Sequence, residues 1–142
     1  MSPARTVLLV DDDADFVEMN RMLLERNGYC VRVAYSGRQC LAEVSTSRPD
    51  IIILDMVMES REDGFDVSRQ LRNSEHTKSI PLVMITSVND SIPFRLEPDR
   101  TWLPVDALLE KPVEPQLLLT VVDKALRPND ASSAPGGTAR RG

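Results

Sequence analysis

Three short runs of consecutive, largely apolar residues constrain the fold of this chain more than any other feature. They span residues 6–10, 51–54 and 80–85, and each is followed directly by a polar side chain. Runs of this length and composition are typical of strands that are buried on both faces of a parallel sheet. Residues 29–35 and 107–109 predict two weaker strands, so we expect a five-stranded sheet.

Apolar residues recur at helical spacing between these strands. Gly28 stands where the first helix would end, Ser36 is an N-cap with Gln39 in capping-box position, and Pro115 opens the last helix. The residues expected on buried helix faces are Phe16, Met19, Leu23, Leu24, Leu41, Val44, Phe65, Val67, Leu71, Leu117, Leu118, Val121, Val122 and Leu126. Because strands and helices alternate, we predict an α/β fold with helices on both faces of the sheet. A ligand site is then expected beyond the carboxyl ends of the strands.

Two segments interrupt this alternation. A helix is expected between residues 88 and 105, but Pro93, Pro98 and Pro104 fall there without an apolar repeat. Since each interior proline costs a helix roughly 3 kcal/mol, we predict a mostly irregular loop. Residues 128–142 contain no large apolar side chain and predict a disordered tail after a single domain at residues 1–127.

Composition narrows the functional classes. The formal net charge of -5 and the pI of about 4.9 argue against nucleic-acid binding, which Lys and Arg drive by neutralising phosphates. Cys30 and Cys40 lie in strand-like and helix-like runs, so we interpret both as core residues without a disulfide. No signal sequence and no membrane-spanning apolar run is recognisable, so a cytoplasmic protein without membrane contact is expected.

Polar side chains follow the apolar strands at the carboxyl edge of the predicted sheet. They are Asp11, Asp12 and Asp13 after the first strand, Asp55 after the third, Thr86 after the fourth and Lys111 after the fifth. Clustered carboxylates repel one another unless a cation joins them, and oxygen ligands of this kind suit Mg²⁺. Such a site would keep Asp55 ionised as a nucleophile for a phosphoryl group, whose oxygens Thr86 and Lys111 could contact.

Four segments resemble the signature segments of the receiver domain of two-component response regulators. They are Val-Leu-Leu-Val-Asp-Asp-Asp at 7–13, Ile-Leu-Asp-Met-Val-Met at 53–58, Met-Ile-Thr-Ser at 84–87 and Glu-Lys-Pro-Val at 110–113. The resemblance covers roughly residues 5–126. It implies a doubly wound, flavodoxin-like three-layer sandwich with strand order 2-1-3-4-5, in which residues 88–105 replace or shorten the fourth helix.

The resemblance also implies residue roles and a cofactor, Mg²⁺. Asp55 would be the phosphoacceptor, Thr86 the switch hydroxyl and Lys111 the phosphate-contacting lysine. The metal ligands implied are Asp11, Asp12 (the favoured direct ligand of that pair), Asp55 and the backbone carbonyl of Val57. Pro112 is expected to follow a cis peptide bond, and Asp13 is interpreted as a helix cap.

The chain departs from the family pattern at several positions. Glu59 replaces the usual proline in a loop that is one residue longer, and Leu108 replaces the usual aromatic switch residue. Val57 and Val88 stand where polar residues help to orient the hydrolytic water, so we predict a long-lived phosphorylated state.

The implied function is phosphorelay signalling by a stand-alone receiver. A sensor histidine kinase or histidine phosphotransfer protein would phosphorylate Asp55, and output would be contact with a downstream protein. The chain would catalyse its own phosphorylation and dephosphorylation without being a turnover enzyme. Phe94 and Trp102 either contact that partner or pack the 88–105 loop down, and His76 is expected to be exposed and inert. A phosphorylation-independent interaction module and a piece of a longer protein remain open alternatives.

Overall fold

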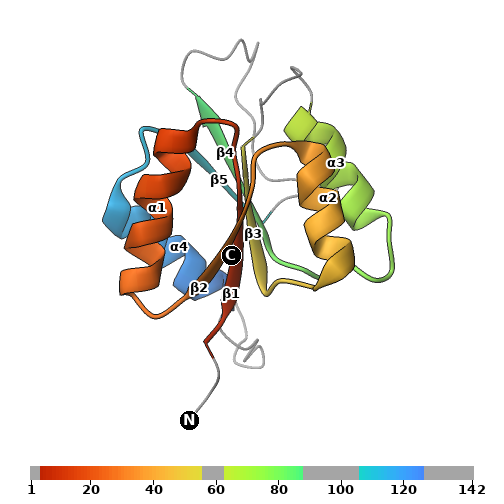
Figure 1. Ribbon diagram of the computed structural model, residues 1–142, viewed down its shortest axis with the longest axis horizontal. Helices are drawn as coiled ribbons and strands as arrows, with labels where there is room; N and C mark the ends of the chain where they lie inside the picture. The colour runs from red at the N-terminus through yellow and green to blue at the C-terminus, as the bar shows by residue number, and fades with distance from the viewer. Residues whose placement is uncertain (1–3, 56–62, 88–105, 127–142) are drawn as a thin grey trace, which may run out of the picture.

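Five parallel strands form one sheet, in which the strands, numbered along the chain, lie in the order 2-1-3-4-5, as the resemblance implied. The computed structural model describes residues 4–55, 63–87 and 106–126. The strands are β1 (Thr6–Val10), β2 (Cys30–Ala34), β3 (Ile51–Asp55), β4 (Leu82–Ser87) and β5 (Ala107–Lys111), and the helices are α1 (Ala14–Arg26), α2 (Gly37–Thr46), α3 (Asp63–Arg72) and α4 (Pro115–Leu126). Figure 1 shows α1 and α4 on one face of the sheet and α2 and α3 on the other, which confirms the three-layer α/β fold.

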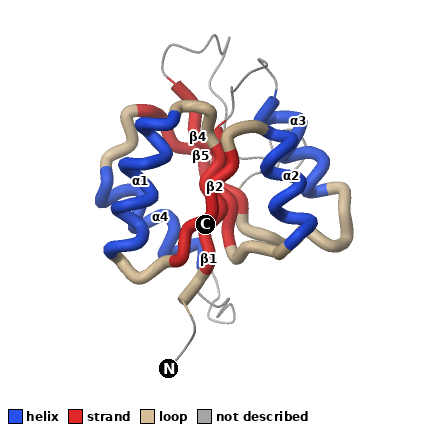
Figure 2. The backbone as a smooth tube through the Cα atoms, viewed as in Figure 1, coloured by secondary structure: helices blue, strands red, loops and turns tan. Residues whose placement is uncertain are grey.

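Two apolar clusters hold the three layers together, with the strands between the helical layers (Figure 2). Successive strand residues point to opposite faces. Val7 and Leu9 of β1 therefore join the cluster under α1 and α4, whereas Leu8 and Val10 join the cluster under α2 and α3. Every residue of β3 is buried, which accounts for its uninterrupted apolar run.

The predicted helix ends are confirmed with one shift. Ser36 caps α2, and its Oγ accepts the Gln39 N–H at 3.1 Å. The Gln39 Oε1 atom accepts the N–H of Tyr35 at 2.8 Å rather than that of Ser36, so the second capping bond lies one residue earlier. Gly28 follows α1 with φ of +94°, the left-handed conformation that glycine adopts without strain.

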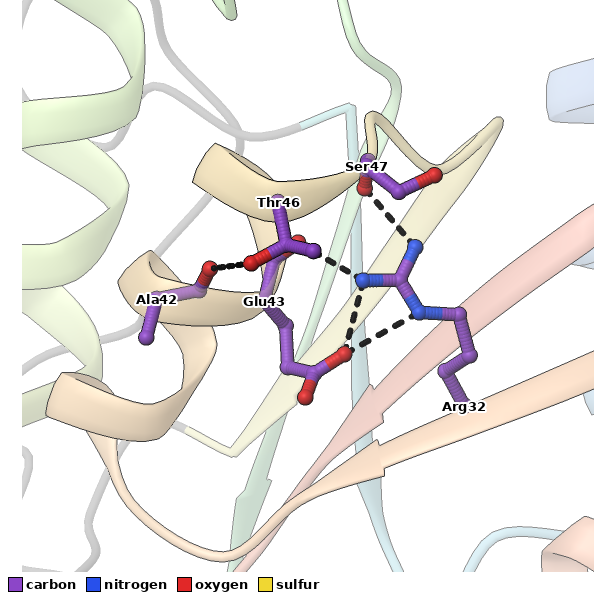
Figure 3. Close-up of polar contacts among 5 residues, drawn as sticks. All are labelled: Arg32, Ala42, Glu43, Thr46 and Ser47. Carbon is purple, nitrogen blue, oxygen red and sulfur yellow. Dashed lines mark hydrogen bonds and ion pairs between the residues drawn. The ribbon is translucent and has the colours of Figure 1, made fainter.

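Arg32 fastens the edge strand β2 to the carboxyl end of α2. Its guanidinium donates to the backbone carbonyl of Glu43 at 2.6 Å, to the Glu43 carboxylate at 2.7 Å, and to the Ser47 carbonyl at 2.7 Å (Figure 3). The Glu43 carbonyl also accepts the Ser47 N–H at 3.0 Å, so Arg32 adds a second hydrogen bond to it and gives the carbonyl of the C-cap residue Ser47 a partner. This role was not predicted from the sequence.

Two aspartates, Asp50 and Asp106, fix pairs of neighbouring strands at their amino ends by the same two hydrogen bonds. Asp50 donates its N–H to the Thr6 carbonyl at 2.9 Å, and its carboxylate accepts the Thr6 N–H at 2.7 Å. Asp106 repeats both bonds with Leu82, at 2.7 and 2.8 Å, and also pairs with Arg72 at 2.8 Å. Because the strands start in fixed register, their carboxyl ends are positioned as well.

Three burial predictions are wrong. Met19 is 64% exposed, because α1 faces the sheet through Val17, Asn20 and Leu24. Since Asn20 is polar, the sequence did not indicate that this was the buried face of the helix. Leu117 is 46% exposed, since α4 is buried at Leu118 and Val122, a spacing of one helical turn. Cys30, interpreted as a core residue, is exposed at the start of the edge strand β2.

The predicted fourth strand begins later than expected. Its ladder starts at Leu82 rather than Ile80, although Ile80 is buried. Pro81 has no N–H to contribute to a ladder, and only its carbonyl bonds β3, by accepting the Ile52 N–H at 3.0 Å.

Several predictions lie outside the described residues. These are the loop at 88–105 with Phe94, Trp102 and Val88, the Val57 carbonyl, Glu59, the burial of the Phe65 side chain, and the tail at 128–142. The domain boundary at residue 127 therefore stays a prediction. Within the described residues, Cys30 and Cys40 form no disulfide, and no helix is long and apolar enough to cross a membrane.

Candidate functional site

The carboxyl edge of the sheet carries the polar residues that the sequence placed there. Asp55 ends β3 opposite Ile85, and the neighbouring Thr86 lies on β4. Lys111 ends β5 opposite Ser87. Asp11 follows β1 directly and donates its N–H to the Ala34 carbonyl at 3.1 Å, so the first acidic residue continues the β1–β2 pairing.

Three carboxylates meet at this edge. One oxygen each from Asp11, Asp12 and Asp55 lies within 4.8 Å of the others. Asp11 and Asp55 are 0% and 5% exposed, whereas Asp12 faces solvent. The Asp11 Oδ1 atom accepts the Asp13 N–H at 2.9 Å. Its buried Oδ2 atom accepts no hydrogen bond of sound geometry in the described part of the chain, and its contact with Lys111 is an ion pair.

This donor set fits Mg²⁺. The cation binds oxygen atoms, commonly through one or two carboxylates with water and phosphate oxygens completing its shell. Two of the three carboxylates are buried and the third is exposed, so the group is open to water on one side. A divalent cation here would offset the repulsion among the carboxylates and would bond an oxygen that lacks a hydrogen bond.

Lys111 is the cation that the described residues supply to this cluster. Its Nζ lies 2.9 Å from Asp11 Oδ2 and 3.8 Å from Asp55 Oδ2. Partial burial disfavours the charged ammonium, but the contact with Asp11 and the attraction to Asp55 and Asp13 outweigh it, so the pKa of Lys111 is raised above 10.5. The lysine is therefore a permanent positive charge beside the buried carboxylates at neutral pH.

The remaining predicted residues are placed as follows. Thr86 is 4% exposed near the end of β4, and its role as the switch hydroxyl stays a prediction. Asp13 is the N-cap of α1, as predicted, and accepts the N–H groups of Asp15 and Phe16. The Lys111–Pro112 peptide bond is cis, as the resemblance implied.

Two further residues bear on the interpretation of the site. His76 is exposed, as expected for a residue outside the chemistry. Phe16 was predicted only as a core residue, yet its ring centroid lies 4.4 Å from Lys111 Nζ. Nothing in the spacing of an aromatic residue along a helix indicated that contact.

Comparison with known proteins gives the family. Residues 7–123 match the family described as the response regulator receiver domain. The chain therefore belongs to the response regulator receiver family, which functions in two-component signalling.

Similar proteins agree with this assignment. The DNA-binding response regulator MtrA of Mycolicibacterium paratuberculosis is 34% identical over 128 residues, which cover 90% of this chain and 54% of MtrA. The chain thus spans about half the length of this curated relative. A putative response regulator from Chloroflexus aurantiacus has a similar structure, with a TM-score of 0.77 and 32% identity over 87% of this chain and 98% of that one. The chemotaxis response regulator CheY4 of Vibrio cholerae gives a TM-score of 0.73 and 28% identity over 87% and 99%.

Proposed function

We propose that this chain accepts a phosphoryl group on Asp55 in a Mg²⁺-dependent reaction. The donor would be a sensor histidine kinase or a histidine phosphotransfer protein. The observation that carries the proposal is the charge arrangement around Asp55: two neighbouring acidic residues within 4.8 Å and a lysine ammonium at 3.8 Å. The ammonium favours the charged form of the Asp55 carboxylate and would attract the oxygens of an incoming phosphoryl group, while the acidic neighbours offer ligands to a cation.

The reaction uses these residues in defined roles. An Asp55 carboxylate oxygen forms the new P–O bond while the P–N bond of the donor phosphohistidine breaks, and the imidazole leaves with that electron pair. Lys111 and Thr86 contact the phosphoryl oxygens. Asp11, Asp12, Asp55 and the Val57 carbonyl would hold Mg²⁺, which supplies positive charge to the transferring group.

The output is proposed to be contact with a downstream protein. The net charge of -5 disfavours direct contact with nucleic acid. MtrA is described as DNA-binding, but this chain spans about half its length, so that property is not carried over. The chain would catalyse only its own phosphorylation and dephosphorylation. Val57 and Val88 support the proposal of a slowly hydrolysed phosphoryl group.

Mass spectrometry after incubation with acetyl phosphate and Mg²⁺ tests the proposal. The expected result is a mass increase of one phosphoryl group that EDTA prevents and that Asp55→Asn abolishes. Asp66→Asn is the matched control, since Asp66 is an exposed aspartate on α3. Absence of an adduct on the unmodified chain would favour the phosphorylation-independent module instead.

A further inference from the structure

The ammonium of Lys111 is held by an aromatic ring as well as by carboxylates. Its Nζ lies 4.4 Å from the centroid of the Phe16 ring, in addition to the contacts with Asp11 and Asp55. A cation at this distance is attracted by the negative face of the ring. The ring and the carboxylates together leave the Lys111 side chain 22% exposed.

A closed circuit of contacts fixes the position of that ring. The Phe16 N–H donates to Asp13 Oδ1 at 3.3 Å, and the Asp13 N–H donates to Asp11 Oδ1 at 2.9 Å. The Asp11 Oδ2 atom pairs with Lys111, whose ammonium returns to the Phe16 ring. The Phe16 carbonyl accepts the Asn20 amide at 2.8 Å, which ties the same residue into α1. These bonds fix the backbone of Phe16 relative to the acidic residues, and packing against the cluster under α1 and α4 places its ring.

We propose that Phe16 is a positioning residue for Lys111. Its ring keeps the ammonium at the mouth of the carboxylate cluster, because a neutral aliphatic side chain there would desolvate the charge without attracting it. The ring also packs against the cluster under α1 and α4, so it has a structural role that must be separated from the proposed one. The expected effect on phosphoryl transfer rests on the proposed function, but the geometry of Lys111 does not.

Three variants separate these roles. Phe16→Leu keeps apolar bulk and removes the ring face, whereas Phe16→Tyr keeps the ring face. Leu23→Val alters the same apolar cluster from the same helix, about two helical turns after Phe16. Loss of a cation–π contact predicts that Phe16→Leu lowers the second-order rate constant for phosphorylation by acetyl phosphate about 3- to 30-fold. Phe16→Tyr should restore most of that rate, and Leu23→Val should leave it unchanged.

A double-mutant cycle distinguishes positioning from general packing. If Phe16 acts through Lys111, Phe16→Leu has no further effect on the rate in a Lys111→Met background. An equal rate loss in both backgrounds, an unimpaired Phe16→Leu variant, or a failure of Phe16→Tyr to recover would each overturn the proposal.

Proton NMR of the metal-free chain gives a readout that does not depend on phosphorylation. The ε-methylene protons of Lys111 should be shifted upfield by the ring in the unmodified chain and in Phe16→Tyr, and should return toward ordinary values in Phe16→Leu. Signals that do not differ between the unmodified chain and Phe16→Leu overturn the inference. If the unmodified chain takes up no phosphoryl group, the proposed function fails, and the NMR result alone still decides the role of Phe16.

Discussion

Replacing Lys111 by methionine should destabilise the metal-free chain and make its stability strongly dependent on Mg²⁺. The two contacts at 2.9 and 3.8 Å each correspond to about 4–6 kcal/mol of gross attraction at an effective dielectric constant of ~20. The cost of burying the charges offsets most of this, and breaking a buried ion pair from one side costs roughly 3–5 kcal/mol. Since Lys111 is 22% exposed, we expect a loss of about 3 kcal/mol, the low end of that range.

Mg²⁺ should recover much of this loss in the variant. Without Lys111, the three carboxylates within 4.8 Å keep their mutual repulsion and have no ammonium beside Asp11 Oδ2. A divalent cation that binds the folded state alone stabilises it by about 2.7 kcal/mol at a concentration 100 times its Kd. Lys111→Met should also bind Mg²⁺ more tightly than the unmodified chain, because the ammonium no longer competes for Asp11.

Urea unfolding followed by circular dichroism, in EDTA and in excess MgCl₂, measures both effects. Lys124→Met is the matched control, since it removes the same charge from an exposed position on α4 and should change stability by about 0.5 kcal/mol or less. A loss below about 1 kcal/mol for Lys111→Met in EDTA, or a loss of equal size in Mg²⁺, would refute this account of the ion pairs.

Three other substitutions test separate parts of the structure. Asp13→Ala should lower the free energy of unfolding by about 1 kcal/mol through loss of the α1 N-cap, whereas Asp13→Asn should keep most of that free energy. Urea unfolding in EDTA compares the two variants, and equal losses would argue against capping. Arg32→Met should cost about 1–3 kcal/mol by removing the hydrogen bonds that join β2 to Glu43 and Ser47. It should also speed amide hydrogen exchange at the start of β2, and unchanged exchange would contradict the fastening role. Burial and the nearby Asp123 raise the pKa of Tyr29 above 10.0, although Arg5 opposes this shift. Above pH 10.0 the folded state therefore keeps the phenol proton that the unfolded state loses. The free energy of unfolding should therefore fall as pH rises above 10.0. Urea unfolding midpoints across alkaline pH should show a smaller fall for Tyr29→Phe than for the control Tyr35→Phe, whose residue is exposed.

Much of the fold was predictable because buried strands and helix ends have local causes. The run at 51–54 has no polar position because β3 is covered on both faces. Ser36 and Gly28 mark helix ends through their own chemistry and conformation. Met19 was mispredicted because Asn20, which is 5% exposed and satisfies its amide on the Phe16 carbonyl, occupies a core position with a polar side chain.

The charged residues of the candidate site were also predictable, but the contacts among them were not. Parallel strands bring Asp11, Asp55 and Lys111 to one edge whatever the loops do. The sequence did not indicate that Lys111 would pair more closely with Asp11 than with Asp55, because that depends on side-chain distances across β1, β3 and β5. The contact with Phe16 depends in the same way on where α1 begins.

The two edges of the sheet use aspartate in opposite ways, and this contrast supports the assignment of the site. At the amino edge, Asp50 and Asp106 each accept the N–H of a neighbouring strand residue and donate their own N–H in return, so their hydrogen-bonding capacity serves the fold. At the carboxyl edge, Asp11 Oδ2 is fully buried, has no hydrogen bond of sound geometry among the described residues and depends on a lysine ammonium. Because a buried carboxylate oxygen without a full set of hydrogen bonds is costly, Asp11 Oδ2 is the atom of this edge that would gain most from the proposed Mg²⁺.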